Sequence, residues 1–227
     1  MKNRSEEAER SEHDDLLLGI VHDMRAHLRS SLTNAQLLQR SALESLPIEV
    51  REQLDRIVSS NKDLDRLLSR ISEFAGASHL SSGKTLTLDV ALQSALLQFP
   101  SLPVELAPVS AWAAQQRIRQ EHVRLFVELI DNALKFSANK PVRIEVSGGD
   151  DSSPALVTIS DAGIGIDAAD IDGAFEPLSR LNARDQFPGA GLGLAICRRI
   201  AGLTGATVEL APLPHGGAVA TVILSNV

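Results

Sequence analysis

Apolar side chains recur at alternating spacings of three and four residues near the start of the chain, and this pattern restricts the folds open to it. In the stretch 48–75 the spaced positions are Leu54, Ile57, Asn61, Leu64, Leu68, Ile71 and Ala75. Such spacing is typical of a helix with a coiled-coil-like seam. A second helical pattern covers 15–45, and Pro47 is well placed to start the later helix. The sequence therefore predicts a helical hairpin.

The seam of this hairpin is too large for two helices to enclose. Two hairpins can pair as a four-helix bundle, so a homodimer is the simplest way to bury the apolar positions. Asn61 falls on the seam. Two interpretations stay open for it: a polar residue that fixes the register of the helices, or a seam position that is partly exposed.

The pattern changes at GASHLSSGK, residues 76–84, a Gly- and Ser-containing stretch typical of a linker. We therefore expect a polar N-terminal segment at 1–14, the hairpin at 15–78 and a second domain at 79–227. This second domain is expected to be α+β, an α/β sandwich with a mixed or antiparallel sheet.

The second domain shows both helical and strand patterns. Helices are predicted for RLFVELIDNALKFS and LGLAICRRIAGLTG, at 124–137 and 192–205. TLTLDV, at 85–90, is typical of a strand that leads into a helix. Strands with alternating apolar and polar residues are predicted at 142–148, 155–163, 206–210 and 218–225.

Composition excludes several classes of partner. The formal net charge is -7 and the calculated pI is about 5.4, and Lys and Arg are scattered, which argues against nucleic acid and against an anionic membrane surface. Cys197 is the only cysteine, as suits a reducing cytosol. The chain begins without the apolar stretch of a signal peptide, and no apolar run approaches the ~18 residues of a membrane span. We expect a cytoplasmic segment with no direct membrane contact.

His22 lies on the polar side of its predicted helix. On a helical wheel it points about 150° away from the centre of the apolar face. That face comprises Leu17, Ile20, Val21, Met24, Leu28, Leu32, Ala35 and Leu38. A core role for this histidine is therefore disfavoured, and an ordinary solvated surface histidine or a functional one remains open.

The string HDMRAHL, residues 22–28, resembles the H-box of sensor histidine kinases. The resemblance implies that His22 is the phosphoacceptor, that Asp23 is the acid that helps to activate it, and that Arg25 is the basic residue of the motif. We assign these three residues to catalysis. A neutral imidazole is a good nucleophile, and a carboxylate on its second nitrogen fixes the tautomer.

Two positions depart from that family's pattern. His27 stands where the family usually has Pro, so the helix bend that Pro promotes is not expected. Ala26 stands where the family has the Thr or Asn that orients a water for dephosphorylating the partner. Because Ala offers no side-chain hydrogen bond, we predict weak phosphatase activity.

ELIDNALKF, at 128–136, resembles the N-box of the ATP-binding domain that histidine kinases share with gyrase-type ATPases. Glu128, Asn132 and Lys135 share one helix face, so one ligand can meet all three. The resemblance implies that Asn132 coordinates Mg²⁺ and that Lys135 neutralises phosphate. Glu128 stands where histidine kinases often have Asn, and it could bind the metal or orient a water.

Three further boxes follow in the family's order. DAGIGI, at 161–166, resembles the adenine-binding box, which implies that Asp161 accepts from the adenine amino group. FEP, at 175–177, resembles the F-box at the start of a lid, and GAGLGL, at 189–194, resembles the phosphate-binding glycine box. The cofactor-binding residues predicted from these boxes are Asp161, Gly163, Gly165, Phe175, Gly189, Gly191, Leu192 and Gly193. In the lid, Arg180 and Arg184 are either phosphate contacts or merely solubilising residues.

The resemblance implies a sensor histidine kinase core that uses ATP and Mg²⁺. It would phosphorylate itself on His22 and pass the phosphate to an aspartate of a response-regulator receiver domain. The sensing region would lie elsewhere, in a longer protein or in another chain. Two alternatives stay open: a histidine phosphotransferase that has lost ATP chemistry, and a serine-directed kinase of the anti-sigma-factor type.

Overall fold

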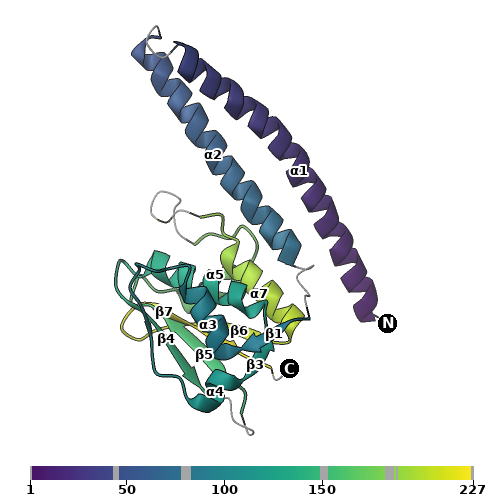
Figure 1. The fold of residues 1–227 in the computed structure, drawn as a ribbon, viewed down its shortest axis with the longest axis vertical. Helices are drawn as coiled ribbons and strands as arrows, with labels where there is room; N and C mark the ends of the chain where they lie inside the picture. The colour runs from purple at the N-terminus through teal and green to yellow at the C-terminus, as the bar shows by residue number, and fades with distance from the viewer. Residues whose placement is uncertain are drawn as a thin grey trace. The chain divides into compact units, whose positions relative to one another are not determined.

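The computed structural model describes residues 2–42, 46–77, 83–148, 153–181, 187 and 189–225. The chain divides into two compact units, Met1–Gly76 and Ala77–Val227 (Figure 1). Most of the predicted linker at 76–84 lies outside the described residues.

The first unit is a helical hairpin made of α1 (Lys2–Ala42) and α2 (Ile48–Gly76), which run side by side (Figure 1). The helix α1 begins well before residue 15, where the apolar pattern starts. Residues 2–14 contain four Glu and two Arg, which favour helix but provide no apolar spacing from which a helix could be predicted.

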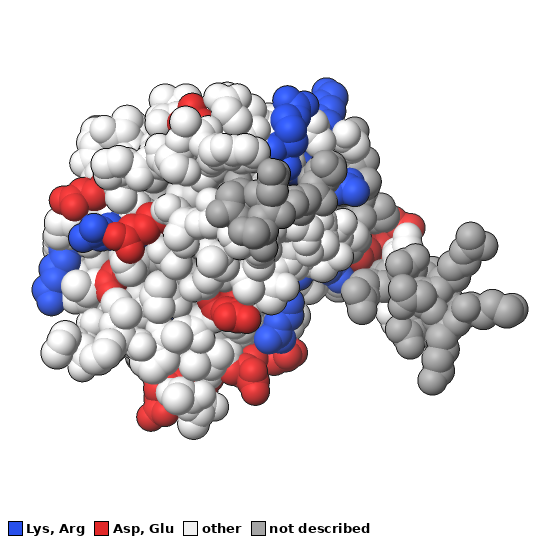
Figure 2. All heavy atoms as spheres, turned by 90° about the horizontal axis from the view of Figure 1, so that it is seen from below, with Lys and Arg blue, Asp and Glu red and all other residues white. Residues whose placement is uncertain are grey.

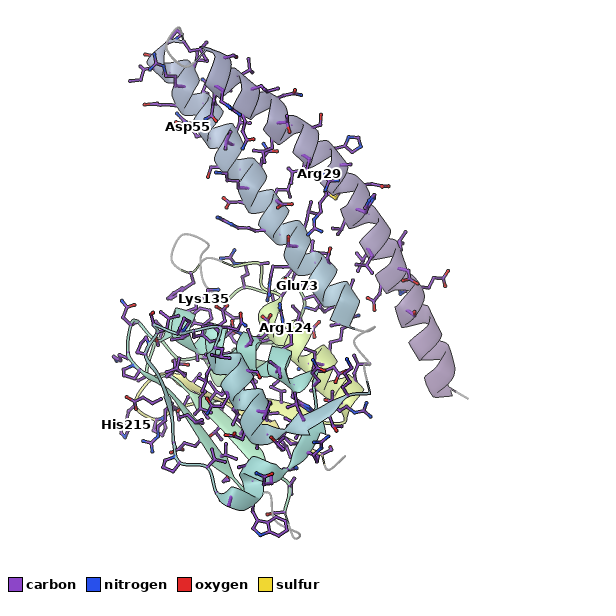
Figure 3. The ribbon with its side chains drawn as sticks, in the orientation of Figure 1. Arg29, Asp55, Glu73, Arg124, Lys135 and His215 are labelled. Carbon is purple, nitrogen blue, oxygen red and sulfur yellow. The ribbon has the colours of Figure 1, made fainter. Side chains whose placement is uncertain are left out.

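The core of the hairpin uses only part of the predicted apolar faces. Val21, Leu28 and Leu68 form a buried cluster with Ile71 packed against it. A polar contact also joins the two helices, since Gln39 Nε2 donates to Asp55 Oδ1 at 2.6 Å, and Figure 3 labels Asp55 on α2. About a third of the predicted positions are exposed: Ile20, Met24 and Leu38 on α1, and Ile57 and Leu64 on α2.

The second unit is built on a five-stranded mixed sheet in the order β2-β4-β5-β7-β6. The pair β2–β4 is parallel, and the other neighbours are antiparallel. The strands are β2 (Val104–Leu106), β4 (Val142–Ser147), β5 (Leu156–Ser160), β6 (Thr207–Pro212) and β7 (Ala218–Ile223). A separate antiparallel pair joins β1 (Thr85–Thr87) and β3 (Arg117–Arg119).

Three helices cover one face of the large sheet: α3 (Leu88–Leu96), α5 (His122–Phe136) and α7 (Gly193–Thr204) (Figure 1). Alternate strand residues such as Ile144, Ile159 and Val222 are buried beneath them. Because successive strand residues point to opposite faces, this alternation marks a two-layer sandwich. The predicted fold class, a helical hairpin followed by an α/β sandwich of the ATP-binding type, is confirmed.

Short elements complete the second unit and were not predicted from the sequence. They are β2, β3, α4 (Ala111–Gln115), η2 (Ala168–Asp170) and α6 (Ile171–Ala174). Each has three to five residues, which is too short for a helical or strand period to be visible. Turn hydrogen bonds hold two of them, since Ser110 caps α4 through the Ala113 N–H and Asp167 caps η2 through the Ala169 N–H.

Candidate functional site

The predicted N-box residues line the side of α5 that meets the start of α7. Glu128 is buried, and a methyl carbon placed on Gly193 would lie 3.3 Å from Glu128 Oε2 and from Asn132 Nδ2, and 3.4 Å from Asn132 Oδ1. Two oxygen donors, one carboxylate and one amide, therefore meet the first residue of α7. A side chain at position 193 would press against these two groups.

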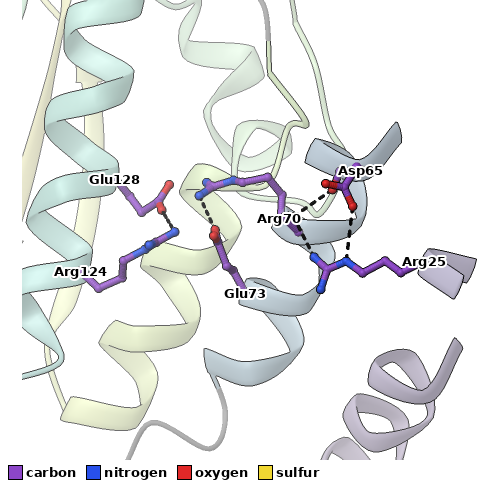
Figure 4. Close-up of polar contacts among 7 residues, drawn as sticks. Arg25, Asp65, Arg70, Glu73, Arg124 and Glu128 are labelled. Carbon is purple, nitrogen blue, oxygen red and sulfur yellow. Dashed lines mark hydrogen bonds and ion pairs between the residues drawn. The ribbon is translucent and has the colours of Figure 1, made fainter. Parts of the chain in front are cut away.

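Arg124, one turn before Glu128 on α5, also contacts the buried carboxylate. Its Nη2 lies 2.6 Å from Glu128 Oε1 (Figure 4). Arg124 was not among the predicted site residues, although an Arg and a Glu four residues apart on a helix can be expected to form an ion pair.

Lys135 extends the same helix face toward the glycine-rich segment. Its Nζ lies 4.7 Å from the centre of the Phe136 ring, and a methyl carbon on Gly189 would lie only 2.8 Å from that Nζ. Figure 3 labels Arg124 and Lys135 along α5. The structure thus brings Glu128, Asn132 and Lys135 together with Gly189 and Gly193.

The glycine-rich segment itself follows a tight path. Gly191 has a positive φ of 69°, and a methyl carbon there would lie 2.5 Å from the carbonyl oxygen of Ser179, so a side chain is excluded at this position. Arg180 donates to the carbonyl oxygens of Gly189 and Phe187 at 2.9 and 2.8 Å. Arg180 therefore holds the backbone of the segment, while Arg184 lies outside the described residues.

The side chain of Leu192 is buried where α7 begins. Phe175, directly after α6, is also buried, and the Arg198 guanidinium carbon lies 4.4 Å from the centre of its ring. Both side chains are packed into the domain.

Asp161 forms a buried turn at the end of β5. Its Oδ1 accepts from the Gly163 N–H at 2.9 Å. Burial raises the pKa of the Asp161 carboxyl, while backbone hydrogen bonds from Gly163 and Ala218 oppose the rise. A raised pKa at a buried polar position is a common property of ligand-binding carboxyls.

Glycines allow the backbone of this turn to pack closely against neighbouring backbone segments. A methyl carbon on Gly163 would lie 1.7 Å from the carbonyl oxygen of Phe136, and one on Gly217 would lie 1.9 Å from that of Asp161. The Ile164 N–H donates to Phe136 O at 3.2 Å, which ties the turn to the end of α5. Gly165, with φ of 76°, comes close to Gly217. Gly217 was not among the predicted site residues. Its closeness to Asp161 and Gly165 depends on the pairing of β5 with β7.

The predicted phosphoacceptor is a solvent-exposed side chain on α1. His22 Nδ1 lies 3.3 Å from Asp23 Oδ1, and the two side chains are 80% and 82% exposed. Although neighbouring helical residues do not face each other, the aspartate reaches the imidazole. The neighbouring Ala26 and His27 are also exposed.

Arg25, the third predicted catalytic residue, turns toward α2 instead. Its Nη2 donates to Ser69 Oγ at 2.7 Å, and its Nε lies 3.7 Å from Asp65 Oδ1 (Figure 4). These contacts join the two helices of the hairpin. In this arrangement Arg25 contributes to hairpin packing, and the His22 side chain is left to pair with Asp23.

The chemistry of the donors fits Mg²⁺ bound together with phosphates. Among the described residues no three His, Cys, Asp or Glu side chains gather as a metal-binding group. Mg²⁺ is usually held by one or two protein oxygens plus phosphate and water oxygens. The carboxylate of Glu128 and the amide oxygen of Asn132, both facing Gly193, supply such a pair.

Neither the surface charge nor the hydropathy of the described residues indicates a second site. On the face in Figure 2, Lys and Arg side chains and Asp and Glu side chains are both spread over a largely neutral surface, with a few of the basic ones close together at the upper right. No described helix combines the length and the apolar character needed to cross a membrane.

Comparisons with known proteins match this architecture. Residues 119–226 match the family described as histidine kinase-, DNA gyrase B-, and HSP90-like ATPase. The phytochrome-like protein Cph1 of Synechocystis sp. is 27% identical over 79% of this chain, which covers 24% of Cph1. The adaptive-response sensory kinase SasA of Synechococcus sp. (strain JA-2-3B'a(2-13)) is 31% identical over 82% of this chain, which covers 52% of SasA.

A solved structure gives the same result for the fold. Full-length ShkA in complex with AMPPNP aligns with a TM-score of 0.65 at 21% identity, over 94% of this chain and 47% of that one. The chain thus spans about half, or less, of each of these relatives.

Proposed function

We propose that this chain transfers the γ-phosphoryl group of ATP to His22, because residues 119–226 match the family described as histidine kinase-, DNA gyrase B-, and HSP90-like ATPase and the chain is similar to the sensory kinase SasA. The phosphoryl group would then pass to an aspartate of a response-regulator receiver domain. The observation that carries this proposal is an exposed histidine paired with an aspartate, in a chain whose ATPase domain gathers oxygen donors at a glycine-rich helix start.

The nucleotide site is proposed to use residues from the turn after β5, from one face of α5 and from the glycine-rich segment before α7. Asp161 would accept from the adenine amino group, and Lys135 would neutralise phosphate near Gly189. Glu128 and Asn132 would hold Mg²⁺, which would neutralise the negative charge on the phosphate oxygens. Backbone N–H groups of the glycine-rich segment, without side chains in the way, are suited to the phosphates.

The reaction at His22 follows from the position of Asp23. With Nδ1 held toward Asp23 Oδ1, the opposite nitrogen, Nε2, is the nucleophile. Its lone pair forms the N–P bond to the γ-phosphorus as the bond from phosphorus to the bridging oxygen breaks and ADP leaves. The imidazole becomes positively charged, and the Asp23 carboxylate stabilises the remaining N–H.

Phosphatase activity toward the partner is proposed to be weak. The exposed side chain four residues after His22 is that of Ala26, which cannot hold a water. The test is whether the protein accelerates the loss of phosphate from its phosphorylated partner. Rapid ADP-dependent loss would contradict this part of the proposal.

Autophosphorylation can be tested with γ-labelled ATP and Mg²⁺. We expect the parent protein to take up label that is acid-labile and alkali-stable, and His22→Gln and Asn132→Ala to take up none. The two variants separate the acceptor from the nucleotide site, because His22→Gln should still bind nucleotide. Label that persists in His22→Gln would overturn the assignment of the acceptor, and acid-stable label would indicate a hydroxyl acceptor instead.

A further inference from the structure

The ion pair between Arg124 and Glu128 differs from a surface pair in its burial. The Glu128 side chain is only 4% exposed, and the Arg124 side chain that contacts it is 37% exposed. By contrast, Arg143 and Glu145 on β4 form an ion pair at 2.8 Å with both side chains more than half exposed. Exposed ion pairs of that kind contribute little to stability. A buried carboxylate, by contrast, is destabilising unless a partner compensates its charge.

The two oxygens of Glu128 face different groups. Oε1 lies 2.6 Å from Arg124 Nη2, and Oε2 faces Gly193, next to the amide of Asn132. The terminal torsion of a Glu side chain is intrinsically broad. The contact with Arg124 therefore selects the rotation of the carboxylate that presents Oε2 beside Asn132.

We propose that Arg124 is a positioning residue for the Mg²⁺-nucleotide site, acting through Glu128. This inference rests on the proposed nucleotide site and deepens it. Carboxylates that bind metals are commonly held by an outer partner, and loss of such a partner costs about 10–100-fold in metal affinity or activity. Arg suits this role because its planar guanidinium fixes the orientation of a carboxylate, whereas a Lys ammonium supplies charge alone.

The test is calorimetric titration of the intact protein with AMPPNP at a series of Mg²⁺ concentrations. In Arg124→Ala we expect the Mg²⁺ concentration for half-maximal enhancement of binding to rise about 10-fold or more. Arg124→Lys should recover part of this loss because it retains the charge. Arg143→Ala, which removes the exposed ion pair on β4, should behave as the parent.

A purely structural role for Arg124 would lower the melting temperature without changing the Mg²⁺ dependence. A double-mutant cycle sharpens this distinction, because adding Arg124→Ala to Glu128→Gln should leave the Mg²⁺ dependence of Glu128→Gln unchanged. The inference is overturned if Arg124→Ala and the parent need equal Mg²⁺, or if Arg124→Ala needs less. Parent protein that binds AMPPNP independently of Mg²⁺ also overturns it.

The same measurements keep this inference separate from the proposed kinase activity. Parent protein that binds AMPPNP with Mg²⁺ dependence but takes no label on His22 would contradict the phosphoacceptor. It would leave the role of Arg124 supported by the titrations.

Discussion

At the scale of single residues, Asp161 links the stability of the domain to the nucleotide binding that we propose for it. Burial raises the pKa of its carboxyl above the ordinary value of 3.8. The folded protein therefore holds this proton more tightly than the unfolded chain does. The contribution of Asp161 to stability is fully present below 3.8 and is lost as the pH rises through the raised pKa.

We predict that Asp161→Asn separates these two effects. The amide resembles the neutral form of the carboxyl and still has an oxygen for the Gly163 N–H, so the ligand-free variant should not lose stability as the pH rises. Its melting temperature relative to the parent should increase between about pH 4 and pH 7. At pH 7 its affinity for AMPPNP should fall about 10-fold or more, the cost of one charged hydrogen bond.

Two measurements check this prediction: thermal unfolding of the ligand-free proteins across that pH range, and titration with AMPPNP. His22→Gln provides the control, because its change lies in the other compact unit. A parent that gains stability over Asp161→Asn as the pH rises would contradict the sign worked out above.

The residues of the site differ in how far the sequence could predict them. Glu128, Asn132 and Lys135 share a helix face, so spacing alone could group them. The closeness of Lys135 to Gly189, or of Gly217 to Asp161, depends on contacts between segments far apart in the chain. Such contacts follow from strand pairing and helix packing, and they cannot be predicted from a local sequence pattern.

At the scale of elements, the turn after β5 is joined to the end of α5 by a close backbone contact. We predict that Gly163→Ala destabilises the domain by about 1–3 kcal/mol or more, because its methyl carbon would meet the carbonyl oxygen of Phe136 at 1.7 Å. Backbone atoms of both elements would have to move. Urea denaturation of the parent and the variant measures the change in the free energy of unfolding.

Gly202 in α7 gives a matched control for that substitution. A methyl carbon there would have no atom within 4 Å, and Ala is a better helix former than Gly by about 0.5–1 kcal/mol. Gly202→Ala is therefore expected to stabilise the domain slightly. If both variants lost similar stability, the close contact at Gly163 would not be the cause.

The long elements of the second unit were predictable because each carries a clear period. The helix α5 and the strands β4, β5, β6 and β7 fall within or next to their predicted ranges. The edge strand β2, with three residues, pairs in parallel with β4 across a long stretch of chain. Neither its length nor its partner could be read from a local pattern.

At the scale of the whole molecule, the hairpin leaves about a third of its predicted apolar seam exposed within the described residues. Val21, Leu28 and Leu68 form the internal cluster, while Ile57 and Leu64 on α2 are 46% and 38% exposed. In a four-helix bundle of two copies, part of the apolar seam packs within each hairpin and the rest packs against the second copy. We therefore propose that the protein is a homodimer that buries these positions.

We predict that Leu64→Glu or Ile57→Glu converts the dimer to monomers in sedimentation velocity experiments. A dimer would bury two uncompensated carboxylates, one from each copy. Each would cost at least about 1–3 kcal/mol, so the dissociation constant should rise about 30-fold or more.

Leu37→Glu tests whether this effect is confined to the seam. Leu37 is 55% exposed, but it lies on the wheel about 160° from the centre of the apolar face of α1. A charge there should leave the dimer intact, because only residues along the seam can be buried by a second copy. If Leu37→Glu dissociated the dimer as strongly as Leu64→Glu, the interface would lie on another face of the hairpin. If all three variants and the parent were monomers, the apolar seam would need a different partner.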